Sequence, residues 1–149
     1  MSKVKKWKYG SVGSIISGTM RPEDLIPAFC EELRSLGHRS KELTKIEKAQ
    51  NKSGYYESED SNFDIESLFD MLDSHAMPYF YFGSHMGDGS DYGFWLSELC
   101  IEDFQGLKVE DTSQVSDSYT GEVLHVNDHG NITLYIANKG KLTEVWSLV

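Results

Sequence analysis

Residues 121–149 read GEVLHVNDHGNITLYIANKGKLTEVWSLV, and this stretch decides the fold class. It contains three runs in which apolar and polar residues alternate, namely GEVLHV, NITLYIA and LTEVWSLV. Alternation with a period of two is typical of half-buried strands. The segments between the runs are short and contain Asn and Gly, as hairpin turns do. The C-terminus is therefore predicted to form a meander of three antiparallel strands.

The register of the first hairpin can also be predicted. With residues 128–130 (Asp-His-Gly) as a three-residue loop, Val126 pairs with Ile132. Leu124 then pairs with Leu134, so that four aliphatic side chains share one face of the hairpin. The third loop residue is a glycine, which readily takes the left-handed conformation that this type of loop needs.

Earlier in the chain, the apolar residues have helical spacing. RPEDLIPAFCEELRSLG, at 21–37, has apolar residues three and four apart, a proline in its first turn and a glycine where a C-cap is expected. SKELTKIEKAQ, at 40–50, predicts a second, weaker helix. A third helix is predicted to begin near Asn62, and Pro78 prevents it from continuing further.

The remaining segments predict strands and loops. YFYF at 79–82 and GFWL at 93–96 are typical of short aromatic strands, and they flank a glycine-rich loop at 83–91. Residues 105–120 are polar and predict a long loop. Helices followed by hairpin-linked strands predict an α+β fold, in which the N-terminal helices pack on one face of a C-terminal antiparallel sheet of about five strands. We expect a single domain, 1–149, because no repeat or linker interrupts the chain.

The net charge of −10 conceals an uneven distribution. Residues 1–53 contain 11 Lys and Arg against 6 Asp and Glu, whereas residues 54–149 contain 3 against 18. The acidic part repels the phosphates of nucleic acids and attracts basic surfaces, such as the nucleic-acid channel of another protein. We therefore expect a protein partner with a basic surface and no direct binding of nucleic acid. The alternative is a solvated surface that only keeps the protein soluble.

The N-terminus and the cysteines indicate a cytoplasmic protein that does not bind membranes. No apolar run approaches the length of a membrane-spanning helix, and the first residues lack the apolar stretch of a secretory signal. Lys3 to Lys8 form a basic arm with Trp7, which we expect to be frayed or folded onto the acidic part. Cys30 and Cys100 have no metal-binding or redox spacing, so we expect two free thiols.

The third predicted helix carries an acidic stripe. Glu66, Asp70 and Asp73 follow one another at helical spacing, so their carboxylates lie on one face, each about 6 Å from the next. This spacing roughly resembles that of phosphates along a nucleic acid. Asp88 and Asp91, in the glycine-rich loop, form a second acidic patch. We expect these five residues to contact the basic partner.

The two predicted hairpin tips offer a different kind of site. His85 lies in the glycine-rich loop with its two aspartates, and Asp128 and His129 lie at the tip of the C-terminal hairpin. If the tips meet, two histidines and up to three carboxylates can bind zinc, manganese or iron, or supply an acid–base pair. If they do not meet, these side chains bond to the backbone of their own turns.

The standard catalytic and nucleotide-binding signatures are absent. The sequence contains no GxSxG, HExxH, CxxC, GxxxxGKS or GxGxxG motif. The glycine-rich loop has no Lys or Arg to hold a phosphate, and it lacks the ligand pattern of a calcium loop. We therefore predict no cofactor and favour a protein that is not an enzyme.

Four blocks of the sequence, GTMRPEDLIPAF, YFGSHMGDGSDYGFW, VNDHGNITLY and EVWSLV, resemble a family of small, functionally uncharacterised proteins of bacterial and phage genomes. The blocks span the helical and the strand regions, so the resemblance covers most of the chain. It implies a bacterial or phage cytosolic setting. It implies no activity and no functional residues.

The leading hypothesis from the sequence is an acidic, non-enzymatic binding protein that inhibits a nucleic-acid-handling protein, as in phage anti-defence or toxin immunity. The alternative is a small-ligand- or metal-binding protein or enzyme that uses the glycine-rich loop 83–91 and the hairpin tip 127–130. A third interpretation is a structural or virion-associated protein, which would self-assemble.

Overall fold

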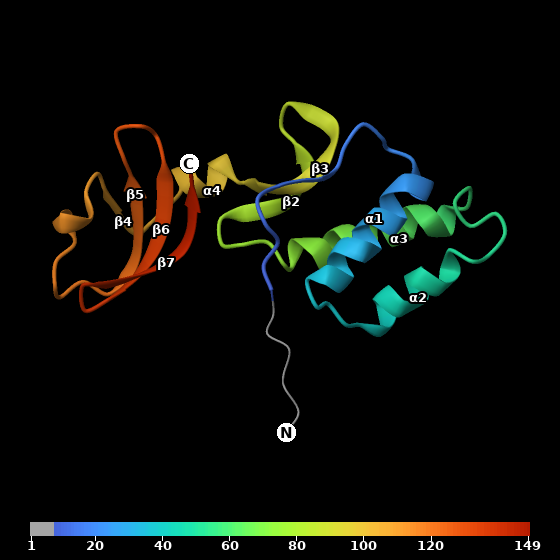
Figure 1. Cartoon of the computed structure of the whole chain (residues 1–149), viewed down its shortest axis with the longest axis horizontal. Helices are drawn as coiled ribbons and strands as arrows, with labels where there is room; N and C mark the ends of the chain where they lie inside the picture. Colours follow the sequence, from blue (N-terminus) through green and yellow to red (C-terminus); the bar gives the residue numbers. More distant parts are fainter. Residues whose placement is uncertain (1–7) are drawn as a thin grey trace, which may run out of the picture. The chain divides into compact units, whose positions relative to one another are not determined.

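The computed structural model describes residues 8–149, and these form two compact units (Figure 1). The first unit ends at Glu98 and the second begins at Leu99. The predicted α+β class is confirmed, since both helices and antiparallel strands are present. The single domain expected for 1–149 stays a prediction. Of the basic arm, residues 3–7 lie outside the described residues.

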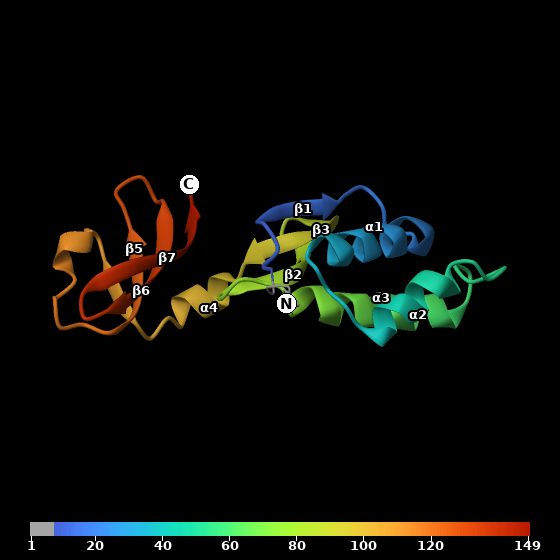
Figure 2. The same ribbon diagram turned by 60° about the horizontal axis from the view of Figure 1, so that its bottom comes forward.

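The first unit contains a three-stranded antiparallel sheet and three helices. Figure 2 shows the strands side by side in the order β1-β3-β2. The strands are β1 (Gly13–Ile16), β2 (Phe80–His85) and β3 (Asp88–Leu96). The helices are α1 (Pro22–Ser35), α2 (Lys41–Ala49) and α3 (Glu59–Asp73). Among residues 8–149, no helix has both the length and the apolar character needed to cross a membrane.

The helices begin where their capping residues dictate. α1 starts with Pro22, whose missing N–H costs nothing in the first turn. Ser40 caps α2 by accepting a hydrogen bond from the backbone N–H of Leu43 at 3.1 Å. Ser58 caps α3 in the same way, so this helix begins three residues before the predicted start at Asn62.

The core of the first unit lies between the helices and one face of the sheet. Phe29 of α1 is fully buried, and its ring centroid lies 5.6 Å from that of Phe69 on α3. It also lies 5.3 Å from the ring centroid of Phe82 on β2 and 5.8 Å from that of Tyr92 on β3. α2 adds Leu43 and Ile46 to the same core. α1 and α3 therefore pack on β2 and β3, whereas the meander belongs to the other unit.

The glycine-rich stretch is mostly strand, so the prediction of a loop at 83–91 was wrong. Gly83 pairs with Gly93, and the turn of the hairpin is reduced to Met86 and Gly87. A Cβ atom on Gly93 would lie only 2.0 Å from the carbonyl oxygen of Gly13. Glycine at this position allows β1 to approach closely enough to pair with β3.

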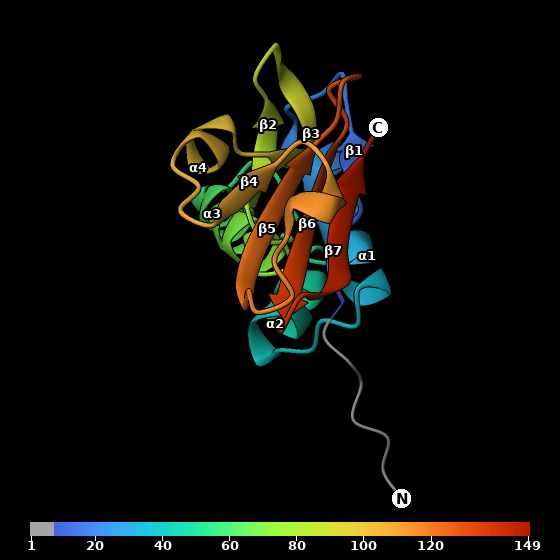
Figure 3. The ribbon, with the colours of Figure 1, turned by 90° about the vertical axis from the view of Figure 1, so that its left-hand side faces the viewer.

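The second unit contains the predicted meander, which is confirmed. Figure 3 shows its four strands in the order β4-β5-β6-β7. Its elements are α4 (Glu98–Glu102, beginning at the boundary), β4 (Leu107–Val109), a 3-10 helix η1 (Thr112–Gln114), β5 (Gly121–Val126), β6 (Ile132–Asn138) and β7 (Lys141–Leu148). The loop predicted at 105–120 thus contains β4, which pairs in parallel with β5, and η1. Residues 8–149 thus contain seven strands in two sheets, whereas about five strands in one sheet were predicted.

The predicted register of the first C-terminal hairpin is confirmed. Val126 pairs with Ile132, and Leu124 pairs with Leu134. Gly130 has a φ of 79°, the left-handed conformation expected of the third loop residue. Both central leucines are buried, which is why a shift by one residue would be costly.

Candidate functional site

α3 presents the predicted acidic stripe to solvent. Glu66, Asp70 and Asp73 are all exposed. The backbone N–H of Phe82 donates a hydrogen bond to Oδ1 of Asp73 at 2.9 Å, so this carboxylate ties the end of α3 to β2. Glu66 and Asp70 form no ion pair with any residue between 8 and 149. Two of the three predicted residues are therefore available to a partner.

An exposed aromatic side chain lies on the same face of α3, and the sequence analysis missed it. Phe63 is 64% exposed and precedes Glu66 by three residues and Asp70 by seven. That spacing places Phe63 with the acidic residues and away from the buried face of the helix. Glu59 extends this face by one turn toward the N-terminus. We call Glu59, Phe63, Glu66 and Asp70 the acidic face of α3.

A groove of about 370 Å³ borders Phe63 between α2 and α3. Tyr55 lines the groove, and its hydroxyl donates a hydrogen bond of 2.5 Å to Oδ2 of Asp64. Burial and this bond raise the pKa of Tyr55, so its hydroxyl stays protonated. Lys45 and Lys48 line the opposite side on α2. The groove thus joins an acidic and a basic wall.

The first hairpin tip satisfies most of its own polar groups. The backbone N–H of Gly87 donates to Nδ1 of His85 at 2.9 Å, and the His85 ring lies edge-on to Trp95. Ser90 donates to Oδ1 of Asp88 through its backbone N–H and its hydroxyl, which lowers the pKa of Asp88. Asp91 lies in β3, and its buried Oδ1 has no hydrogen-bond partner within residues 8–149.

The second hairpin tip is built in a similar way. Asp128 and His129 are exposed, and Oδ1 of Asn127 accepts hydrogen bonds from the backbone N–H groups of His129 and Asn131. Within residues 8–149, no group of three or more His, Cys, Asp or Glu is placed to hold a metal ion. The two tips belong to different units, so a site that needs them to meet stays a prediction.

A second groove, which the sequence analysis did not predict, lies where α1 meets α2. Its volume is about 670 Å³. Five cationic side chains line it together with two hydroxyl groups, and no acidic or aromatic residue is among its described lining residues. We call it the basic groove, lined by Arg39, Lys41, Lys45 and Lys48 with Ser40 and Thr44, and with Arg34 at its wall.

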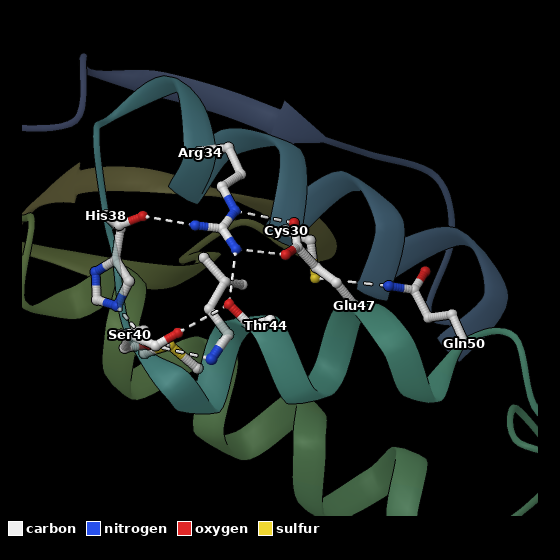
Figure 4. Close-up of polar contacts among 9 residues, drawn as sticks. Cys30, Arg34, His38, Ser40, Thr44, Glu47 and Gln50 are labelled. Carbon is white, nitrogen blue, oxygen red and sulfur yellow. Dashed lines mark hydrogen bonds and ion pairs between the residues drawn. The ribbon is translucent and has the colours of Figure 1, made fainter.

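Arg34 holds the two walls of the basic groove together (Figure 4). Its guanidinium donates two hydrogen bonds to the carboxylate of Glu47, one of them from Nε at 3.0 Å. It also donates to the hydroxyl of Thr44 at 3.1 Å and to the carbonyl of His38 at 3.3 Å. The hydrogen bond from Arg34 lowers the pKa of Glu47, which therefore stays ionised and neutralises the arginine. The other four cations have no ion pair with residues 8–149, so the groove is strongly positive.

A chain of hydrogen bonds lies beneath the start of α2. Nδ1 of His75 lies 2.7 Å from the carbonyl oxygen of Lys8, so this nitrogen is the donor. Nε2 of a neutral His75 then accepts from Nδ1 of His38 at 2.9 Å. Nε2 of His38 faces the hydroxyl of Ser40 at 3.3 Å. Burial, and next the neighbouring His75, lower the pKa of His38, which favours the neutral ring. The chain thus fixes the residue that caps α2.

Neither cysteine forms a disulfide bond. Cys30 is buried in the core of the first unit, and burial raises its pKa to about 11. It therefore stays protonated and unreactive at neutral pH. Cys100 is exposed on α4.

Comparison of the chain with family models, with curated proteins and with solved structures finds no match in any of the three. The resemblance to a family of bacterial and phage proteins stays a prediction.

Proposed function

We propose that this protein is a non-enzymatic binding protein that docks onto a basic surface of a protein partner through the acidic face of α3. The observation that supports this best is Phe63, which is 64% exposed between carboxylates that have no ion pair within residues 8–149. An aromatic side chain supplies most of the apolar area in an interaction hot spot. The surrounding charges steer the partner and set its orientation.

We further propose that the partner is a nucleic-acid-handling protein, which this chain inhibits by occupying its nucleic-acid channel. Residues 54–98 contain ten Asp and Glu and no Lys or Arg, so this part of the first unit has a single sign of charge. Carboxylates about 6 Å apart along α3 are arranged like the charges of a nucleic-acid strand. Phage anti-defence and toxin immunity are settings in which such an inhibitor acts.

The test is an affinity pull-down from a lysate of the source organism, at low and at high salt. The wild type is compared with Phe63→Ala and with Glu66→Gln/Asp70→Asn. The matched control is Glu110→Gln/Glu144→Gln, which makes the same change of charge on exposed residues of the second unit. We expect one partner that is lost with salt and with both α3 variants, that the control retains, and that added nucleic acid displaces.

Two results would contradict the proposal. One is a partner whose capture does not depend on ionic strength. The other is a partner that both α3 variants retain, because that partner would be bound by a different surface. If added nucleic acid does not displace the partner, the protein does not occupy a nucleic-acid channel. That result would contradict the inhibitor interpretation but not the proposal that the acidic face of α3 binds a partner.

A further inference from the structure

We infer that the basic groove between α1 and α2 binds the phosphate backbone of a nucleic-acid strand. Arg39, Lys41, Lys45 and Lys48 converge on the groove, and none of them is neutralised by a carboxylate of residues 8–149. Lys45 and Lys48 also line the groove that borders Phe63, but no residue of the acidic face of α3 lines the basic groove. The inference does not depend on the function proposed above. The basic groove carries the opposite charge and therefore recognises the opposite class of ligand.

The arrangement of the lysines indicates a linear polyanion. Lys41, Lys45 and Lys48 follow one another at helical spacing along one side of α2. With a rise of 1.5 Å per residue, their backbone positions extend over about 10 Å of the helix axis. A groove of about 670 Å³ is also much larger than one phosphate group requires. Several phosphates in a row can therefore be bound at once.

The lining of the groove also indicates how selective the binding is. No aromatic side chain is among its described lining residues, so no base can stack there. The hydroxyl of Thr44 already accepts from Arg34 and donates to the carbonyl of Ser40 at 3.2 Å. The phosphates are thus held by ammonium and guanidinium groups alone. Contacts of this kind give affinity without sequence preference.

Two features make the groove a prepared site. The Arg34–Glu47 pair joins its walls without using the four free cations. The hydrogen-bond chain through His38 fixes Ser40, and the cap orients the first turn of α2. The partial positive charge at the start of that helix adds to the attraction for phosphate. Glu42, Asp60 and Asp64 line the neighbouring groove with Lys45 and Lys48 and therefore weaken the attraction. Carboxylates more than about 10 Å away are largely screened at an ionic strength near 0.1 M.

The test is fluorescence anisotropy of a labelled single-stranded oligonucleotide of about 20 nucleotides, titrated with the full chain at several salt concentrations. Neutralising four phosphates predicts a slope of about −2.8 for log affinity against log salt, or about 50-fold weaker binding at 200 mM than at 50 mM salt. Lys41→Gln/Lys45→Gln/Lys48→Gln should bind at least about 10-fold more weakly at low salt and lower the slope to about −0.7.

Matched variants separate this site from the rest of the chain. Lys108→Gln/Lys139→Gln/Lys141→Gln removes the same charge from the second unit and should leave the affinity unchanged. Phe63→Ala, on the acidic face of α3, should also leave it unchanged, which makes the two proposals fail independently. Circular dichroism checks that each variant is folded.

Three outcomes would overturn the inference. The first is no binding at about 50 mM salt, where electrostatic contacts are strong. The second is full binding by the folded α2 triple variant. The third is displacement of the oligonucleotide by inorganic phosphate or by polyglutamate at the same concentration of charge, because the groove would then be a general anion site.

Discussion

The consecutive helices α2 and α3 are alike on their inner faces and opposite on their outer faces. Each begins with a serine cap, and each buries the apolar residues of its inner face in the same core. The outer face of α2 carries free lysines, whereas that of α3 carries free carboxylates and Phe63. The apolar core uses the inner faces, so the free charges on the outer faces are not needed to form it. The difference in charge is the basis of the two proposals above, one for each outer face.

The largest expected effect is on stability, and it tests whether the inner faces of α2 and α3 stabilise the fold while the outer faces do not. Leu43→Ala removes a fully buried side chain of α2 and should lower the free energy of unfolding by about 2–5 kcal/mol. Phe63→Ala, on the outer face of α3, should change it by less than about 0.5 kcal/mol. Urea denaturation followed by circular dichroism measures both. A large loss with Phe63→Ala would show that this ring belongs to the core.

The next largest expected effect is the loss of stability when either serine cap is removed. Ser40→Ala removes the cap of α2 and also the partner of His38, so it should lower the free energy of unfolding by about 1–2 kcal/mol. Ser58→Ala removes the cap of α3 and should cost about 1 kcal/mol. Equal costs, measured by urea denaturation, would indicate that the bond to His38 adds nothing.

The stability of the protein should depend on pH through His38, whose ring faces the residue that caps α2. The pKa of His38 is lowered in the folded protein, chiefly by burial, so the unfolded chain binds a proton that the folded chain does not. The free energy of unfolding should therefore fall as the pH decreases from about 7 to about 5. His38→Gln should reduce this pH dependence, and His129→Gln, an exposed control, should preserve it. An unchanged slope in His38→Gln would contradict the assignment.

The smallest expected effect concerns the pair that joins α1 to α2. Glu47→Gln breaks a partly exposed ion pair and should lower the free energy of unfolding by no more than about 1 kcal/mol. The same change frees the charge of Arg34 in the basic groove, so oligonucleotide affinity should increase at low salt. A decrease in affinity, with the fold retained, would indicate that the width of the groove matters more than its charge.

The C-terminal hairpin could be predicted residue by residue, and the glycine-rich stretch could not. The alternation of apolar and polar residues and one glycine in the loop were enough to predict that Val126 pairs with Ile132. Both signals lie within a few residues of the turn. The strands around Gly93 depend on β1, which is distant in sequence and approaches only because glycine leaves room for it. The candidate site divides in the same way. Glu66, Asp70 and Asp73 were all predicted from spacing, but only the tertiary structure shows that Asp73 accepts a hydrogen bond from the backbone N–H of Phe82.

The sequence by itself determined the α+β class, the three helices, the meander and the acidic stripe of α3. These follow from periodicity, caps and turn residues, which act between near neighbours in the chain. Only the tertiary structure decided that Arg34 of α1 pairs with Glu47 of α2, and that Arg39 and the lysines of α2 line one groove. Such sites form when the buried faces of different elements pack together. This packing brings together polar residues that are distant in sequence, so no local sequence pattern predicts that they are neighbours.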